Sequence, residues 1–296
     1  INTGFPLATV VAVDIPSGVN ASTGEVSEHA VRANLTVTFG CLKAGHVLKP
    51  GNGCCGEIRV EDIGLSREAM ESIEPFARAL TLTSAADLLP KRPWDAHKYS
   101  SGNVLLVASS AGMTGAAILA ATAAMRTGAG IVRVGCPESL NDIFEIRLTE
   151  ALTAPLPEVR KKRCLSLRAL GRIRELAEKA NAVAIGPGLG RYFETAELVR
   201  RFVGGYRGKI VLDADGINAF EGLAGLLANA RADIVLTPHA GELSRLTGLG
   251  TNEIAADPMR AAKNAARSIG HVVLLKGPAT VIAAPSGEAW LNGTGS

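Results

Sequence analysis

The sequence predicts an α/β protein built on a mostly parallel sheet with helices on both faces. Short apolar segments alternate with longer helical patterns from residue 104 onwards, which is typical of repeated strand–helix units. Glycine-rich or polar turns follow most of the apolar segments. The composition, with 47% hydrophobic residues, 20% charged residues and 33 glycines, is that of a globular protein with many tight turns.

The charge and hydropathy patterns exclude several classes of protein. A net charge of +3 is too small to indicate nucleic-acid binding, and the one basic cluster, residues 160–163 (RKKR), is typical of a solvated loop. The most apolar helical stretch, residues 115–125, ends at Arg126 and is shorter than the roughly 20 residues needed to cross a membrane. We therefore expect neither a nucleic-acid nor a membrane partner.

The cysteines indicate a reducing compartment. There are five of them, an odd number; Cys54 and Cys55 are adjacent, and no CxxC spacing occurs. Neither a disulfide framework nor a zinc site has this pattern, so we expect a cytoplasmic protein. The chain starts at Ile1 rather than Met and stops on a loop-like segment, residues 293–296, so we expect it to be truncated at both ends.

The first segment, residues 9–15 (TVVAVDI), is apolar and β-branched and predicts a buried parallel strand. The turn that follows places Asp14 and Ser17 at the carboxyl end of this strand, within reach of a polar ligand or a cation. The residues by themselves favour the alternative in which Asp14 only caps the turn. Residues 35–39 and 57–63 are the next expected strands.

A change in composition predicts a domain boundary after these strands. The pattern loosens from Arg67 to about Leu80, and residues 83–93 are polar and bounded by prolines. We assign residues 1–66 to a first domain and residues 67–296 to a second.

The second domain is expected to repeat the strand–helix unit. Its predicted strands are residues 104–108, 131–135, 182–185, 210–212, 234–236, 272–275 and 280–284. Its predicted helices are residues 115–127, 165–179, 194–203, 241–246 and 258–269.

A glycine-rich loop follows the predicted strand at residues 182–185. The stretch AVAIGPGLG ends in Gly186, Gly188 and Gly190, which leave no side chain between the backbone and a ligand. Backbone amides can then approach an anion or a flat ring. A βα turn that only requires positive φ angles has the same sequence, so the loop alone decides neither function nor structure.

Three further strands end in polar residues, and their carboxyl ends would meet at one edge of a parallel sheet. These residues are Asp213 and Asp215, then His239 and Glu242 in TPHAGE, and Lys276 in KGPAT. Each has a plain alternative as a helix cap or an exposed side chain. Four such loops at one edge nevertheless favour a ligand site.

Lys276 suits a phosphate-bearing ligand, because its ammonium supplies charge beside a glycine that admits backbone amides. His239 is able to donate or accept a proton near neutral pH. No GxxxxGK[ST] is present and no GxGxxG follows a strand, which excludes the P-loop and the Rossmann fingerprint.

Several motifs together resemble the NAD(P)H-hydrate dehydratases, a family with a ribokinase-like fold. The matching stretches are His97-Lys98 with Gly102, MTGAAILAATAAMRTGAGIV, AIGPGLG, LDADGIN, LTPHAGE and LLKGPATVIAAPSGEAWLN. They occur in the family's order and cover nearly all of residues 95–296. VVAVDIPSGVNASTGE, TFGCLKAGHVLKPG and GEIRVEDIGL resemble the end of an NAD(P)H-hydrate epimerase domain. The first domain would then be a remnant of a Rossmann-like α/β epimerase.

The resemblance implies a lyase that dehydrates the S epimer of hydrated NADH or NADPH at the expense of ADP or ATP with Mg²⁺. The fused epimerase would interconvert the R and S hydrates and hold K⁺. Carried over by motif, the residues that face the hydrate would be Ala116, Gly188, Gly190 and His239, with Asp14 in the epimerase part. The nucleotide would lie on Lys276, Gly277, Pro278, Ala279 and Thr280, and K⁺ would bind at Ser17. A homo-oligomer is expected.

The sequence departs from the family pattern in three respects, one of which is that the asparagine- and glycine-rich hydrate-binding loop of the epimerase is expected before Ile1. Ser109 and Ser110 stand where the family usually has Gly-Gly. The Gly-x-Gly-Asp that would supply the catalytic base is expected beyond Ser296, so we expect residues 1–296 alone to be inactive and poorly soluble. Two other functions remain open: a kinase of the same fold acting on a sugar or a vitamin alcohol, and a protein-binding role for the first domain.

Overall fold

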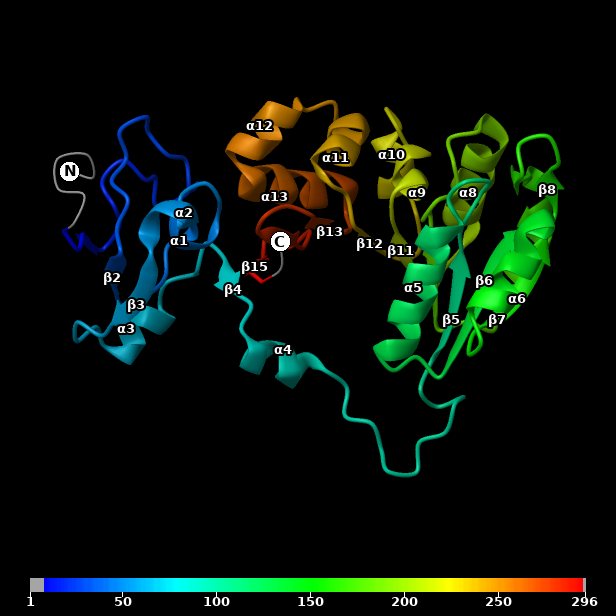
Figure 1. Ribbon diagram of the computed structural model, residues 1–296, viewed down its shortest axis with the longest axis horizontal. Coiled ribbons are helices and arrows are strands. Elements are labelled where there is room, and N and C mark those ends of the chain that lie inside the picture. The colour runs from blue at the N-terminus through cyan, green and yellow to red at the C-terminus, as the bar shows by residue number, and fades with distance from the viewer. Residues whose placement is uncertain (1–7, 295–296) are drawn as a thin grey trace.

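The structure is a computed structural model that describes residues 8–294. A small sheet and a large sheet lie at successive positions along the molecule (Figure 1). The small sheet has three parallel strands in the order β1-β2-β3. These are β1 (Val11–Val13), β2 (Leu35–Phe39) and β3 (Glu57–Glu61), accompanied by α1 (Ala44–Val47), α2 (Asn52–Cys55) and α3 (Arg67–Glu71).

The expectation that residues 9–15 form a buried strand is wrong in two ways. Strand β1 spans only Val11–Val13, and the side chains of Val11 and Val13 are 53% and 70% exposed. Among the described residues, β1 is an edge strand that pairs only with β2. An apolar β-branched run therefore marks a strand here without marking its burial.

The large sheet has ten strands in the order β4-β15-β14-β13-β12-β11-β10-β5-β6-β7. Its strands are β4 (Arg78–Ala79), β5 (Asn103–Val107), β6 (Ile131–Pro137), β7 (Leu152–Leu156), β10 (Ala182–Ile185), β11 (Lys209–Leu212), β12 (Asp233–Leu236), β13 (Val272–Leu275), β14 (Thr280–Ala283) and β15 (Ala289–Asn292). Neighbouring strands are parallel except for the antiparallel pairs β13–β14 and β14–β15. The predicted, mostly parallel sheet is therefore confirmed.

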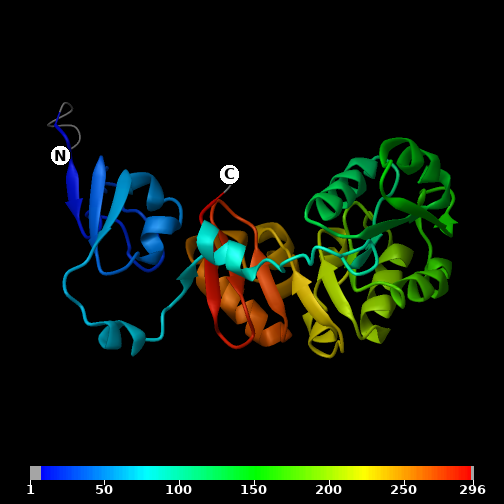
Figure 2. The ribbon, with the colours of Figure 1, turned by 90° about the horizontal axis from the view of Figure 1, so that it is seen from below.

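The connection between the two sheets is long. After β4 at one edge, the chain forms α4 (Leu82–Leu88) and then runs along the large sheet to enter it at β5, near the other edge (Figures 1 and 2). Helix α4 lies inside the segment whose composition predicts a domain boundary. A hairpin of β8 (Glu158–Val159) and β9 (Cys164–Leu165) forms a separate two-stranded sheet.

Helices flank both faces of the large sheet. They are α5 (Thr114–Arg126), α6 (Asn141–Arg147), α7 (Leu170–Ala177), α8 (Phe193–Gly205), α9 (Asp215–Asn218), α10 (Ala224–Ala228), α11 (Ala240–Thr247), α12 (Thr251–Ala256) and α13 (Pro258–Ile269), with short 3₁₀ turns at Glu138–Leu140 and Leu167–Ala169. None of the helices in residues 8–294 is both long and apolar enough to span a bilayer.

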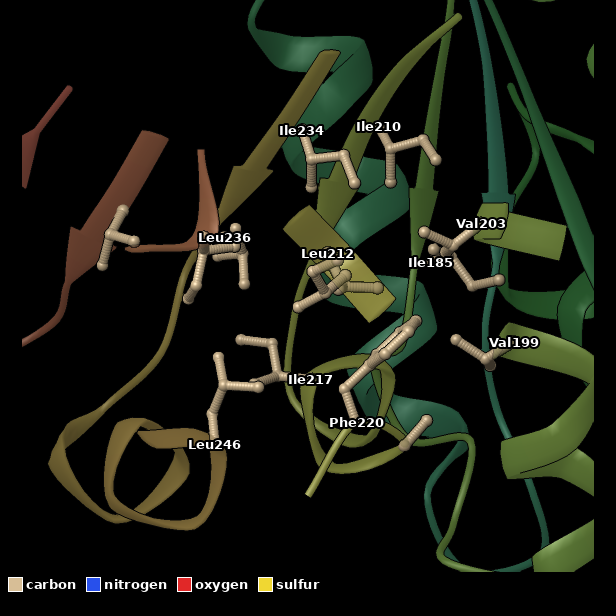
Figure 3. Packing of buried hydrophobic residues seen from close by; sticks show 14 of the residues in the cluster. Ile185, Val199, Val203, Ile210, Leu212, Ile217, Phe220, Ile234, Leu236 and Leu246 are labelled. Atoms are coloured by element: carbon tan, nitrogen blue, oxygen red, sulfur yellow. The ribbon is translucent and has the colours of Figure 1, made fainter. Parts of the chain in front are cut away.

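The main core lies between one face of the large sheet and helices α7 to α13. Strands β10 to β14 alternate buried with more exposed side chains, as half-buried strands do. Figure 3 shows Ile185, Leu212 and Leu236 from three neighbouring strands pointing toward Val199 of α8 and Ile217 of α9. This apolar layer fixes the ends of the strands, where the polar loops begin.

Helices α5 and α6 cover the opposite face, but only beside β5 to β7. Leu106 packs with Ala117 of α5 and Phe144 of α6, whereas its neighbour Leu105 belongs to the main core. Further along the same face, Val211 is 38% exposed. In the described part of the chain, the second layer of helices is thus confined to one end of the sheet.

Most elements predicted for the second domain are present, with one helix displaced. The helix predicted at residues 165–179 begins later, because Cys164 and Leu165 form β9 and a 3₁₀ turn follows. Strands β7 and β15 and helix α6 were not predicted, since their short segments lack a clear period.

Candidate functional site

The glycine loop after β10 is packed so closely that two of its glycines admit no side chain. A Cβ at Gly186 would lie 1.7 Å from the carbonyl oxygen of Asp213, and one at Gly188 would lie 2.7 Å from that of Met113. Gly186, Gly188 and Gly190 all have positive φ, at 131°, 65° and 76°. The turn therefore does require glycines with positive φ, and this conformation places the loop against the beginning of α5.

This packing joins three predicted residues. The Cβ of Ala116 lies 3.4 Å from the Cβ position of Gly188. The backbone N–H of Gly190 donates to Asp215 Oδ2 at 2.8 Å, and Ser110 Oγ donates to the Gly188 carbonyl at 2.9 Å. Ala116, Gly188 and Gly190 thus form one corner of the rim at the carboxyl ends of the strands.

Ser109, which stands in place of a family glycine, keeps the conformation that favours glycine. Its φ is 84°, its side chain is fully buried, and its Oγ has no hydrogen-bond partner among the described residues. Its N–H donates to the Pro187 carbonyl at 2.9 Å, which ties this turn to the glycine loop.

A second cluster lies at the ends of β11, β12 and β13. Lys276 Nζ donates to Asp213 Oδ1 at 2.8 Å, and Thr237 Oγ1 donates to the same oxygen at 2.7 Å. Lys276 Nζ also lies 3.8 Å from Glu242 Oε2. The lysine therefore faces two carboxylates, and its side chain is 42% exposed, open to solvent on the remaining side.

His239 is the N-cap residue of α11, and both of its ring nitrogens contact neighbouring groups. Its Nδ1 accepts from the backbone N–H groups of Gly241 at 3.0 Å and Glu242 at 3.4 Å. The proton must then reside on Nε2, which lies 3.2 Å from Glu242 Oε1. Glu242 Oε2 in turn accepts from the His239 N–H at 2.8 Å, which completes a reciprocal capping box.

The rim therefore brings together most of the predicted residues of the second domain. His239 and Lys276 form an isolated parallel bridge, and the Lys276 N–H donates to the Pro238 carbonyl at 2.8 Å. Gly277, Pro278 and Ala279 continue from Lys276 to Thr280, the first residue of β14. Asp213 links the two corners, because its carbonyl packs on Gly186 while its carboxylate holds Lys276.

Asp14 belongs to a separate cluster in the small sheet. Its Oδ1 accepts from Lys43 Nζ, from Thr38 Oγ1 at 3.0 Å and from the Phe39 N–H at 3.3 Å. The neighbouring ammonium of Lys43 lowers the pKa of Asp14, with further lowering by the other two donors. His46 Nε2 lies 3.0 Å from the Asp14 carbonyl, and burial lowers the pKa of His46.

Among the described residues, Ser17 forms a hydrogen bond only through its backbone. Its carbonyl accepts from the Val31 N–H at 2.9 Å, and the residue is exposed. Asp14 Oδ1 is already taken by Lys43, so the two residues do not by themselves form a cage for K⁺. Such a cage needs several oxygen ligands around one point.

The described residues do not form a protein cage for Mg²⁺ either. Within residues 8–294, no three His, Cys, Asp or Glu side chains are grouped so that they can hold a metal ion. Asp213 and Glu242 offer two carboxylates at the rim, both directed at Lys276. This fits a Mg²⁺ that arrives with phosphate ligands and keeps its waters, not one held in a protein cage.

Thr237, Glu242 and Lys43 each contact a predicted site residue, although their sequence context predicts no function for them. A signal for Glu242 is present, because His239 and Glu242 have the spacing of a capping box. Thr237 and Lys43 carry no such signal. Their contacts depend on which strands are neighbours, and a single sequence does not give that order.

The fold and the rim define the class of protein: a ribokinase-like α/β protein with its site at the strand carboxyl ends. Residues 104–296 match the family described as NAD(P)H-hydrate dehydratase, and residues 2–45 match the family described as YjeF-related protein N-terminus. The chain belongs to the NAD(P)H-hydrate dehydratase family. The family predicted from the motifs is confirmed.

Curated relatives match nearly the whole chain. The bifunctional NAD(P)H-hydrate repair enzyme Nnr of Moorella thermoacetica is 39% identical over 286 residues, which cover 97% of this chain and 54% of that protein. The protein of the same name from Thermofilum pendens is 37% identical over 287 residues, again covering 97% and 54%. The chain spans about half the length of the curated relatives that it matches.

Two solved structures share the fold. The ADP/ATP-dependent NAD(P)H-hydrate dehydratase from Bacillus subtilis, co-crystallised with ATP/Mg²⁺, is 32% identical with a TM-score of 0.61, and the match covers 74% of each chain. A ribokinase-like superfamily protein from Enterococcus faecalis has a TM-score of 0.64 and 22% identity over 76% of this chain and 74% of its own, which shows the fold alone.

Proposed function

We propose that the part of the chain built on the large sheet binds hydrated NADH or NADPH together with ADP or ATP and dehydrates the S epimer. The single observation that carries this proposal is the junction at Asp213. It connects the glycine loop with Lys276 in a chain that matches the dehydratase family over residues 104–296.

The two corners of the rim suit the two ligands. At one corner, Gly188 and Gly190 present backbone without side chains next to Ala116, so we assign the hydrate to the outer surface of this corner. At the other corner, the ammonium of Lys276 and the backbone of Gly277 suit phosphate. Because Lys276 already faces Asp213 and Glu242, a phosphate there must either share the ammonium or compete with two carboxylates.

His239 lies between these corners. In the structure both of its ring nitrogens are engaged, so contact with the hydrate requires Nε2–H to leave Glu242 or to be shared with it. Its proposed role is therefore that of a positioned hydrogen-bond donor. Dehydration at the expense of ADP or ATP balances if the terminal phosphoryl group passes to the hydroxyl oxygen, after which the bond from carbon to that oxygen breaks, phosphate leaves and the neighbouring carbon loses a proton. A hydrogen-bond donor at that oxygen assists the departure.

The remaining assignments belong to the same proposal. We place the dehydratase domain at residues 67–296 and a part of an epimerase domain at residues 1–66, in which Asp14 contacts the hydrate and Ser17 contributes to K⁺ binding. Mg²⁺ would accompany the nucleotide. A cytoplasmic homo-oligomer completes the proposal; the free thiols of all five cysteines are consistent with a reducing compartment.

The competing function is a kinase of the same fold. The family match and the 32% identical dehydratase from Bacillus subtilis favour dehydration over phosphorylation of an alcohol. Competition experiments separate the two functions. Hydrated NADH should bind to residues 1–296, and a sugar or a thiazole alcohol should not compete with it for the site. Ligand binding is the deciding measurement, because it distinguishes the two functions by the molecule that the site accepts.

Lys276→Ala tests the nucleotide assignment. We expect ADP to bind about 10- to 100-fold more weakly by calorimetry, because a charge-assisted hydrogen bond contributes roughly 1.5–3 kcal/mol. The loss should shrink as salt is raised, since part of the contact is a screened charge interaction.

The matched control is Lys209→Ala. This lysine is the first residue of β11, at the opposite end of the strand from the rim, and its removal should leave ADP affinity unchanged. An ADP affinity that does not respond to Lys276→Ala at any salt concentration would remove Lys276 from the site.

A further inference from the structure

A cavity beside the candidate site has walls from both parts of the chain. Its volume is about 530 Å³, within the range of small-molecule sites. One wall is the segment Lys276–Ala279, residues 276–279, on which we place the nucleotide. The opposite wall is a loop of the first part, made by residues 48–50 and Gly53. This loop lies more than 200 positions away in the sequence from the segment that it faces.

The chemistry of the walls suits a nucleotide. Most of the lining is apolar, with Leu48, Pro50 and Pro278 as well as Ile254 of α12. Such surfaces accept the face of a heterocyclic base. Lys49 and Lys276 are the two charged residues of the lining, and their ammonium groups suit the phosphates of the same ligand.

The loop is held in place by apolar packing. Leu48 is only 1% exposed and belongs to the main core cluster together with Leu275 and Ala279. Ala44 and Val47 of α1 pack against that cluster as well. Burial of a leucine side chain contributes about 1.5–3 kcal/mol, so the loop is anchored where it borders the cavity.

We propose that residues 48–53 form a wall of the adenine-nucleotide site, with the base held between this loop and Lys276–Ala279. The inference rests on the proposed function, because it takes the nucleotide to lie on that segment. It adds that residues of the first part contact the nucleotide, so the two parts of the chain share one site. Nucleotide affinity then depends on the first part as well as on the large sheet.

Gly53 allows a direct test. No heavy atom lies within 4 Å of the position that its Cβ would take, and its backbone is helical, within α2. The Cβ of a phenylalanine at this position therefore meets open space at the border of the cavity. For Gly53→Phe we expect at least about a tenfold increase in the dissociation constant for ADP, measured by calorimetry on residues 1–296.

Gly171→Phe is the matched control. Gly171 is also an exposed helical glycine with open space around its Cβ position, but it lies in α7 and does not line the cavity. ADP affinity should stay at the wild-type value in this variant. Circular dichroism and thermal melting of both variants establish that each is folded. If Gly53→Phe fails to fold, Lys49→Glu takes its place, with the same expected loss of ADP affinity.

The outcomes separate this inference from the proposed function. Weaker ADP binding in Gly53→Phe and in Lys276→Ala, with Gly171→Phe unchanged, supports the shared site. Wild-type affinity in folded Gly53→Phe, together with weaker binding in Lys276→Ala, overturns the shared site and leaves the nucleotide assignment standing. Failure of the wild-type chain to bind ADP overturns the proposed function itself.

Discussion

Each of the two parallel sheets ends in a cluster of lysine, aspartate and threonine, and the two clusters are supported differently. In the small sheet, Asp14 Oδ1 accepts from Lys43 Nζ and from Thr38 Oγ1. The strand that carries Asp14 is an exposed edge strand, with Val13 70% exposed. Below the cluster, His46 is 1% exposed and contacts the Asp14 carbonyl. Polar contacts therefore hold this cluster in place.

In the large sheet, Asp213 Oδ1 accepts from Lys276 Nζ and Thr237 Oγ1 in the same pattern. The preceding residue, Leu212, is fully buried. The residues that pair with it on the two neighbouring strands are fully buried as well. Here the apolar core fixes the strand ends, and the polar cluster is left with half-exposed groups that a ligand is able to reach. The comparison shows that the same three side chains meet in the same pattern after an exposed edge strand and after a buried central strand, so the two clusters differ in the packing beneath them.

The largest expected effect tests this difference in support. Leu212→Ala removes a fully buried side chain from the layer beneath Asp213 and should cost about 2–5 kcal/mol of unfolding free energy. Val13→Ala, directly before Asp14, should change it by less than about 0.5 kcal/mol because that side chain is exposed. Denaturant unfolding checks both values, and comparable losses in the two variants would show that the small sheet is supported by packing as well.

A smaller effect concerns the pH dependence that His46 gives to the small sheet. Burial lowers the pKa of His46 below its ordinary value of 6.5, and its Nδ1 already accepts from the Lys43 N–H at 3.1 Å. Below pH 6.5 the unfolded chain therefore binds a proton at this residue that the folded chain does not. Stability of the small sheet should fall as pH drops through that range, by at most about 1.4 kcal/mol per pH unit.

Amide hydrogen exchange of β2, corrected for the intrinsic effect of pH, measures this loss. In His46→Gln the dependence between pH 6.5 and pH 5 should disappear. Asp14 does not interfere, because its lowered pKa contributes stability that is lost only as pH falls below its ordinary value of 3.8. A slope that persists in His46→Gln would assign the proton to another group.

Much of the large sheet and its rim was predictable, because the signals are local. Each loop at the rim follows a short apolar strand, and the glycines that permit close packing, such as Gly186, are visible in the sequence. The carboxyl ends of parallel strands meet at one edge by geometry. The presence of Gly188, His239 and Lys276 at one edge thus follows from the parallel fold class, whereas their individual contacts do not.

What the sequence did not reveal depends on contacts between distant segments. Val11 and Val13 are 53% and 70% exposed among the described residues, and no property of the strand itself records whether another element packs on it. The contact of Lys43 with Asp14 and the approach of Leu48 to Leu275 both require the relative placement of separate elements. Apolar runs and turn residues carry no information about that placement.

The smallest expected effect concerns two residues with positive φ, one in each part of the chain. Ser109 has φ 84° and a buried Oγ without a partner among the described residues. Glycine adopts this conformation without strain and removes the unsatisfied hydroxyl, although it adds conformational freedom to the unfolded chain. For Ser109→Gly we therefore expect a gain of about 1 kcal/mol in unfolding free energy.

Asp14 has φ 66°, so the same substitution also relieves its backbone. Its carboxylate, however, accepts from Lys43, Thr38 and the Phe39 N–H, and Asp14→Gly leaves these donors without that acceptor. We expect this variant to lose stability, because the polar contacts outweigh the relief of strain. Thermal unfolding of the pair gives the comparison. If Ser109→Gly also lost stability, either the added freedom of the unfolded chain outweighs the relief of strain or the hydroxyl bonds a buried water.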